Sequence, residues 1–133
     1  MMKHLAVAAA AILFWPALAL ANPAGVYDVV GGNTDGTSGY RGEVSVERTG
    51  ETYRVTWIIA GKTHIGTGIG AKFEGDRFEM GPATEDDTAI SVGYVAADGF
   101  GIAMFFEQPD GEWAGVWTYG GSNRVAGETW TRR

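Results

Sequence analysis

After residue 21, apolar and polar residues alternate in short runs, and eight times such a run stops at a glycine-containing turn and then starts again. Residues 51–61 show the alternation most clearly, with apolar or aromatic side chains at every second position. These are Tyr53, Val55, Trp57 and Ile59, and the polar residues between them include Arg54 and Thr56. A period of two with β-branched and aromatic residues is typical of a strand with one buried face. The chain is therefore predicted to be an all-β protein.

Turn residues divide the chain into nine predicted strands. They cover residues 25–30, 39–48, 51–60, 62–73, 76–81, 88–96, 100–108, 112–119 and 124–132. Asp98-Gly99 and Pro109-Asp110-Gly111 are strong hairpin signals between two alternating runs. Because parallel strands need long crossovers, the short links predict an antiparallel meander.

Glycines inside the predicted strands favour a closed architecture. All 21 glycines follow residue 21. Those inside strands include Gly42, Gly66, Gly68, Gly93, Gly101, Gly115 and Gly127. A strand glycine usually accompanies a bend, a bulge or a close approach of another group. Eight or nine such strands predict a small up-and-down antiparallel β-barrel, which leaves no open edge. A two-sheet β-sandwich is the alternative, because the pattern separates the two architectures poorly.

The first 21 residues have the features of an export signal. A basic start precedes an uncharged apolar stretch from Leu5 to Leu20, and Ala19-Leu20-Ala21 is a small-x-small cleavage site. We therefore predict a signal peptide, a signal helix over residues 1–21 that is removed after Ala21. An uncleaved anchor is disfavoured because the stretch is shorter than the roughly 20 residues of a membrane span and contains Pro16. We expect an exported protein, periplasmic or secreted, with one domain over residues 22–133.

Charge and cysteine content exclude several classes of partner. Without the leader the chain has about 112 residues, the 133 of the full chain less 21, with nine basic residues against 16 acidic ones. Such an acidic domain suits neither nucleic acid, which needs clustered Lys and Arg, nor an anionic membrane surface. The chain has no cysteine, so packing and hydrogen bonds alone must hold this exported domain together.

No residue pattern predicts catalysis, a cofactor or a metal. His64 is the one histidine beyond the leader, and a single imidazole makes a poor transition-metal site. No serine lies in a Gly-x-Ser-x-Gly elbow. Glu85-Asp86-Asp87 could supply calcium ligands, but the spacing is not that of an EF-hand loop. We therefore expect a protein that is not an enzyme.

Aromatic side chains and acidic loops are the candidate binding residues. Trp113, Trp117 and Tyr119 share one face of a predicted strand. Such rings either line a ligand or protein-binding site or fill the interior of a small barrel. Loops 31–38 and 81–88 are further candidates, since binding residues gather on loops held by a rigid scaffold. The candidate binding residues are Asp35, Tyr40, Glu85, Asp86, Asp87, Trp113, Trp117 and Tyr119.

A set of short motifs connects the chain to a family. In order, these are Gly25-Val26-Tyr27, Asp35-Gly36, Tyr40-Arg41-Gly42, Tyr53-Arg54-Val55-Thr56-Trp57, Gly66-Thr67-Gly68-Ile69, Gly115-Val116-Trp117 and Gly127-Glu128-Thr129-Trp130. With these motifs the chain resembles a group of small exported proteobacterial proteins that are labelled hypothetical or "fibronectin-binding". The Gly-x-Tyr opening and the closing strand also resemble those of avidin-like and lipocalin-like barrels, which is a likeness of architecture alone.

Three functions are compatible with this sequence. The first is a non-enzymatic interaction protein whose partner is a host matrix or envelope protein, which the family resemblance implies. The second is a carrier that binds a small apolar molecule in the mouth of the barrel. The third, a hydrolase that uses carboxylates, has no motif in its favour. A partner-binding protein should expose an aromatic patch, whereas a carrier needs an open apolar cavity.

Overall fold

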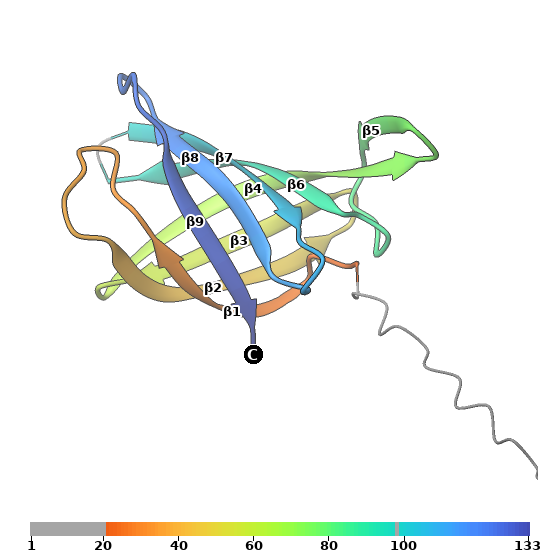
Figure 1. The fold of residues 1–133 in the computed structure, drawn as a ribbon, viewed down its shortest axis with the longest axis horizontal. Helices are drawn as coiled ribbons and strands as arrows, with labels where there is room; N and C mark the ends of the chain where they lie inside the picture. Colours follow the sequence, from red (N-terminus) through yellow and green to blue (C-terminus); the bar gives the residue numbers. More distant parts are fainter. Residues whose placement is uncertain (1–20, 98) are drawn as a thin grey trace, which may run out of the picture.

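Antiparallel pairing runs from strand to strand around a closed ring (Figure 1). The computed structural model describes residues 21–97 and 99–133. The strands are β1 (Gly25–Gly31), β2 (Tyr40–Thr49), β3 (Thr52–Ile59), β4 (Lys62–Glu74), β5 (Arg77–Gly81), β6 (Ala89–Ala96), β7 (Gly99–Glu107), β8 (Trp113–Tyr119) and β9 (Ala126–Arg132). Pairing follows chain order from β1 to β4 and from β6 to β9, and the β4–β6 and β9–β1 pairs close the ring. The predicted small antiparallel barrel is confirmed, and the two-sheet sandwich is excluded.

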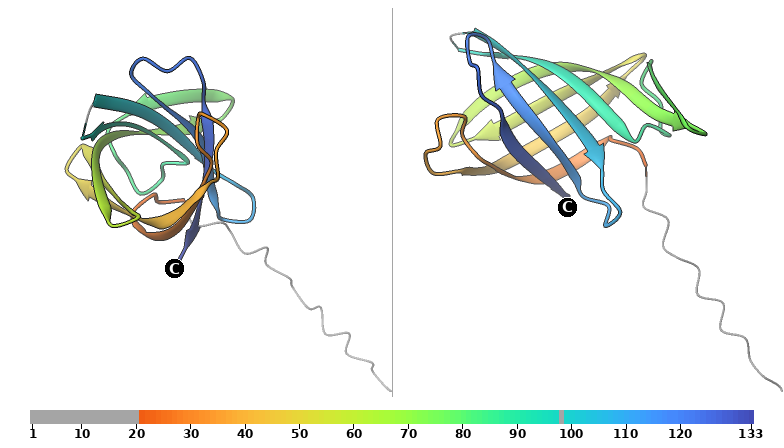
Figure 2. Two further views of the ribbon diagram at one scale, coloured as in Figure 1. Left: turned by 90° about the vertical axis from the view of Figure 1, so that its left-hand side faces the viewer. Right: turned by 45° about the horizontal axis from the view of Figure 1, so that its top comes forward.

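Strand β5 lies outside the ring. It pairs with the end of β4, from Gly70 opposite Gly81 to Glu74 opposite Arg77. This hairpin projects beyond one end of the barrel (Figures 1 and 2). The barrel therefore consists of eight strands with one added strand.

The predicted strand boundaries agree with the observed ones to within about two residues. The signal helix lies outside the described residues, which begin at Ala21. None of the described residues forms a helix long and apolar enough to cross a membrane.

One of the two-residue hairpin loops joins β3 to β4 through Ala60 and Gly61. Ile59 pairs with Lys62, so the loop has two residues. Both have positive φ, 51° at Ala60 and 75° at Gly61. Positive φ at both positions defines a type I′ turn, whose twist matches that of the flanking strands. Glycine adopts this conformation without strain, which suits Gly61 to the second position of the turn.

Aromatic rings from several strands fill the interior. Tyr53, Val55 and Trp57 of β3 are buried while Arg54 is exposed, as the alternation predicts. Trp130 of β9 lies at the centre, stacked on Phe105 with ring centroids 4.0 Å apart. The inner positions of β4 are Gly66, Gly68 and Gly70, where a Cβ would crowd side chains of the barrel interior. Glycines on this wall make room for side chains of the neighbouring strands and of the loop before β6, which lie close against the β4 backbone.

The barrel is closed at the end near β5. The side chain of Asp87 is 1% exposed and accepts hydrogen bonds from the Tyr53 hydroxyl, at 2.5 Å, and from the backbone N–H of Thr84, at 2.8 Å. Pro23 is fully buried, and its carbonyl accepts a hydrogen bond from the Tyr27 hydroxyl at 2.6 Å. The segment before β1 and the loop before β6 therefore plug this end.

Candidate functional site

The opposite end of the barrel opens into a cavity. The loop between β1 and β2 lies at this end, drawn in orange toward the viewer on the left of Figure 2. The cavity has a volume of about 280 Å³. Small-molecule pockets typically measure about 300–1,000 Å³, so this one suits a compact ligand.

Aromatic side chains form most of the cavity wall, and a few polar groups lie among them. The aromatic residues are Tyr40, Trp57, Tyr94, Phe105, Trp117 and Tyr119. The polar residues are Asn33, His64 and Glu128, and the remaining wall is Ile59, Ala96 and Ala103. Glu128 is the one carboxylate among the described residues that line the cavity.

Glu128 is a buried carboxylate held by three neutral donors. Its side chain is 6% exposed. The indole N–H groups of Trp57 and Trp130 donate to Oε1 at 2.8 Å and 2.6 Å. The Tyr40 hydroxyl donates to Oε2. These bonds compensate part of the solvation that the carboxylate lost on burial.

Glycines on both sides give the Glu128 side chain its space. Its cross-strand neighbours are Gly31 of β1 and Gly115 of β8. A Cβ at Gly31 would overlap the ring of Tyr40, and one at Gly115 would overlap the Met104 carbonyl oxygen. The carboxylate therefore stands between two side-chain-free positions, which leaves the interior around it open to the aromatic rings.

Tyr40 and Tyr94 are held against glycine backbone and remain protonated. A Cβ at Gly101 would overlap the ring of Tyr94, just as one at Gly31 would overlap Tyr40. Burial, followed by the nearby Glu128, raises the pKa of Tyr40 far above its usual value. Burial, again followed by Glu128, raises the pKa of Tyr94 to about 12. Both phenols are therefore neutral hydrogen-bond donors at physiological pH.

Trp117 contributes a ring and an unused donor to the cavity. Its ring lies 6.3 Å from that of Tyr40 and 6.4 Å from that of Tyr119, between centroids. The indole N–H opposes part of the rise in the Tyr40 pKa. It is nevertheless buried, and it forms no hydrogen bond of acceptable geometry with any residue that the structure describes. A buried donor without a partner is uncommon in folded proteins, and here it lies in the wall of a cavity.

The loop between β1 and β2 is ordered by its own side chains. The Asp35 carboxylate accepts hydrogen bonds from the backbone N–H and the hydroxyl of Thr37, at 2.9 Å and 2.6 Å. These bonds lower the pKa of Asp35. Asn33, which lines the cavity, donates to the Ser38 carbonyl and to the Thr37 hydroxyl. The loop thus forms one compact rim of the mouth, an arrangement typical of Asx turns.

The sequence-predicted site residues divide between the two ends of the barrel. Tyr40, Trp117 and Tyr119 meet in the cavity wall, and Asp35 is exposed in the adjacent loop. The loop of Glu85, Asp86 and Asp87 lies at the closed end. Glu85 and Asp86 are exposed there, whereas Asp87 is buried in a structural hydrogen-bond network. Trp113 is fully buried in the core. No acid or histidine cluster that could hold a metal ion occurs among the described residues.

Sequence reasoning did not single out Glu128, Trp57 or Tyr94 as site residues. One signal was available for Glu128. It occupies an inward position of its strand, between the buried Ala126 and Trp130. A charged residue in such a position is rarely buried without partners. The hydrogen bonds from β2 and β3 could not be foreseen, because they depend on the closed pairing of the barrel.

The outer surface of β6, β7 and β8 is apolar. The three strands contain one charged residue, Glu107, at the end of β7. Val95 and Phe100 are cross-strand partners, as are Met104 and Val116. The strongly exposed apolar residues of this surface are Val95, Phe100, Ile102 and Val116. We call this surface, on β6–β8, the apolar outer face.

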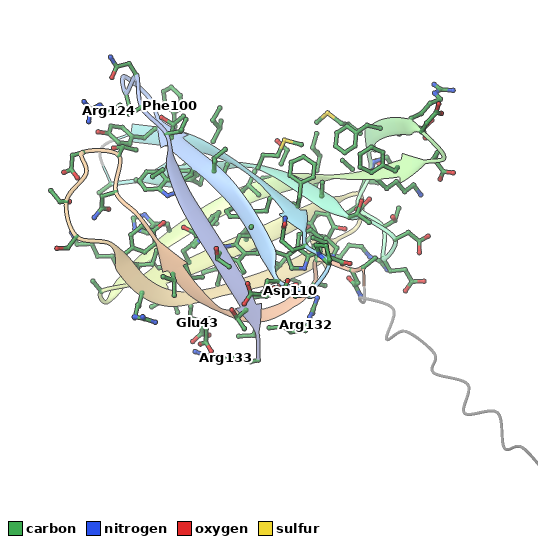
Figure 3. The ribbon with its side chains drawn as sticks, viewed as in Figure 1. Glu43, Phe100, Asp110, Arg124, Arg132 and Arg133 are labelled. Atoms are coloured by element: carbon green, nitrogen blue, oxygen red, sulfur yellow. The ribbon has the colours of Figure 1, made fainter. Side chains whose placement is uncertain are left out.

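The opposite outer surface is charged. Arg133 forms ion pairs with Asp28 at 2.8 Å and with Glu43 at 3.0 Å, and Figure 3 shows Arg133 beside Glu43. Exposed ion pairs of this kind contribute little to stability. The outer surface of the barrel is therefore apolar over β6–β8 and carries these charged residues on the opposite side.

No protein-family model matches the sequence, and no curated protein matches it significantly. The barrel, its mouth cavity and its outer surface are the features that bear on function.

Proposed function

We propose that this protein is a non-enzymatic binding protein that takes a compact small molecule into the mouth of the barrel. The supporting observation is the cavity of about 280 Å³, walled by six aromatic rings and containing the buried carboxylate of Glu128. Ligand sites in small barrels lie at the mouth, and ligand pockets combine apolar walls with a few placed polar groups. Of the three functions compatible with the sequence, the carrier best fits this geometry.

A blocked mouth should abolish binding. Ala96 lines the cavity near the end of β6 and is partly exposed, so Ala96→Trp should fill the entrance without entering the packed core. We expect the uncharged fluorescent probe N-phenyl-1-naphthylamine to bind the wild-type protein and to bind Ala96→Trp at least about tenfold more weakly, a loss of about 1.4 kcal/mol. Fluorescence titration measures both affinities.

The matched control is Val95→Trp. Val95 is the neighbouring residue on the same strand, and its side chain is exposed on the apolar outer face. This variant adds the same ring outside the barrel and should keep the wild-type affinity for the probe. Equal weakening by both substitutions, or no weakening by either, would contradict a binding site in the mouth.

The apolar outer face supports a second candidate function, that of an interaction protein. Exposed apolar patches commonly take part in protein–protein contacts. The face continues onto the β5 hairpin, because the ring of Phe78 on β5 lies beside that of Phe106 on β7, with centroids 5.9 Å apart. The resemblance to exported proteins labelled "fibronectin-binding" favours a matrix or envelope protein as the partner.

A charge placed on the apolar outer face should disrupt such a contact. We expect Val116→Glu to weaken binding to immobilised fibronectin about tenfold or more, as for a residue in the centre of an interface. Val30→Glu is the control, since Val30 is an exposed valine on the outer side of β1. Equal affinities of the two variants and the wild-type protein would exclude this face as the fibronectin site.

A further inference from the structure

The carboxylate of Glu128 has no cationic partner among residues 21–97 and 99–133. All three of its hydrogen-bond donors, two indoles and one phenol, are neutral. Among the described residues, no lysine, arginine or histidine forms an ion pair with it. Buried charges in proteins are usually paired or bound to a metal. This carboxylate therefore lies in the wall of the cavity without an ion-pair partner in the described part of the chain.

The two oxygens of Glu128 are not equally occupied. Oε1 accepts two hydrogen bonds, from Trp57 and Trp130. Oε2 accepts one, from Tyr40. Since a carboxylate offers about four acceptor sites, Oε2 can accept one more donor or lie against a positive charge. Tyr40, Trp57 and Glu128 all line the cavity, so the carboxylate and two of its donors border the space that a ligand would occupy.

Neighbouring rings around the cavity are tilted against one another and do not form one parallel stack. Tyr40 and Trp117 meet at an interplanar angle of 59°, with centroids 6.3 Å apart. Trp57 and Tyr94 meet at 60°, with centroids 5.7 Å apart. Two tilted pairs expose ring surfaces in different directions. A cage of this kind attracts cations through the negative faces of the rings, and quaternary ammonium groups are its best-known ligands.

We infer that the mouth cavity binds a small alkylammonium cation, whose charged nitrogen lies between the aromatic rings and Glu128. This inference rests on the proposed function, of which it specifies the ligand. The small volume limits the ligand to a compact molecule, and the net charge of −6 attracts cations to the protein. An apolar uncharged ligand would add nothing to the hydrogen bonds that already compensate part of the burial of the carboxylate. An anion would be repelled by it.

Choline and its uncharged isostere 3,3-dimethylbutan-1-ol test the charge of the ligand directly. The two molecules have nearly the same shape and differ in the charge at the branched end. We expect choline to bind the full-length protein at least about tenfold more tightly than the alcohol in isothermal titration calorimetry at pH 8, since desolvated cation–π contacts favour the charged ligand.

Glu128→Gln tests the role of the carboxylate. Glutamine keeps the shape and an acceptor for the two indoles but removes the charge. We expect choline to bind this variant at least about tenfold more weakly, and the alcohol to bind it as it binds the wild-type protein. Asp86→Asn is the matched control, because it removes one negative charge from an exposed residue at the closed end. It should leave both affinities unchanged.

The outcomes separate this inference from the proposed function. Equal affinities of the wild-type protein for choline and the alcohol would overturn the cation inference, and so would equal weakening by Glu128→Gln and Asp86→Asn. The cavity would remain a binding site if N-phenyl-1-naphthylamine still bound and Ala96→Trp still blocked it. If choline, the alcohol and the probe all failed to bind, both proposals would fall. If Glu128→Gln did not fold, the comparison of choline with the alcohol on the wild-type protein would still decide the inference.

Discussion

Trp130→Ala should lower the free energy of unfolding by about 4–5 kcal/mol, the upper part of the range for buried aromatic residues. Trp130 is fully buried, and its ring is stacked on that of Phe105 with centroids 4.0 Å apart. Its ring centroid also lies 5.5 Å from that of Tyr27 and 6.2 Å from that of Trp57. Its N–H also donates to Glu128 at 2.6 Å. The substitution would therefore empty the centre of the core and remove a hydrogen bond from a buried carboxylate.

Denaturation in urea measures this effect, by circular dichroism and tryptophan fluorescence. A domain of this size has a total stability of about 5–15 kcal/mol, so the variant should lose a large share of its stability and unfold at a much lower urea concentration than the wild-type protein. Val125→Ala is the control, because Val125 is exposed in the loop before β9, and we expect a change within about 0.5 kcal/mol. A denaturation midpoint of Trp130→Ala close to that of the control would show that Trp130 is not at the centre of the core.

Asp87→Ala should destabilise the protein by about 3 kcal/mol. The residue lies in the acidic Glu85-Asp86-Asp87 loop, whose sequence suggests a solvated segment in which substitutions have little effect on stability. The carboxylate is 1% exposed and joins Tyr53 of β3 to Thr84 of the loop. Hydrogen bonds to charged groups contribute about 1.5–3 kcal/mol each, and unsatisfied buried donors add to the loss. The loop at the closed end would lose the group that attaches it to the barrel wall.

Asp86→Ala is the matched control, one residue away and with the same change of charge. Asp86 is exposed, so its replacement should leave the melting temperature nearly unchanged. Similar melting temperatures of the two variants would show that the hydrogen bonds of Asp87 do not hold the closed end. A double-mutant cycle with Tyr53→Phe would measure how much of the effect passes through the 2.5 Å contact between the two side chains.

The strands could be predicted from the sequence because each depends on local alternation. In β3, every second residue from Tyr53 to Trp57 is buried, as a period of two requires. The closure of the ring, by contrast, is not determined by local alternation. It depends on the β4–β6 pairing across the β5 hairpin, and pairing between segments cannot be read from the alternation within either of them.

The candidate site was only partly predictable for the same reason. Tyr40, Trp117 and Tyr119 were recognisable as large rings on strands, but their meeting with Trp57 and Tyr94 requires the closed barrel. Glu85-Asp86-Asp87 has the densest acidic sequence, yet its third carboxylate is buried in a structural network at the other end. Local acid density does not distinguish a solvated loop from a buried hydrogen-bond acceptor, whereas the inward position of Glu128 does.

The two ends of the barrel differ, because one end is plugged and the other opens into the cavity. Arg132 donates to the carbonyls of Asn22 and Ala24 at 2.8 Å each, so the start of the described chain is fastened to the end opposite the mouth. A tether attached ahead of Asn22 would therefore hold the barrel by its closed end. The mouth, where the β1–β2 loop lies, would then face away from the support. Immobilisation through the N-terminal side should leave the cavity accessible to ligands in solution, and a bulky group attached there should not obstruct it.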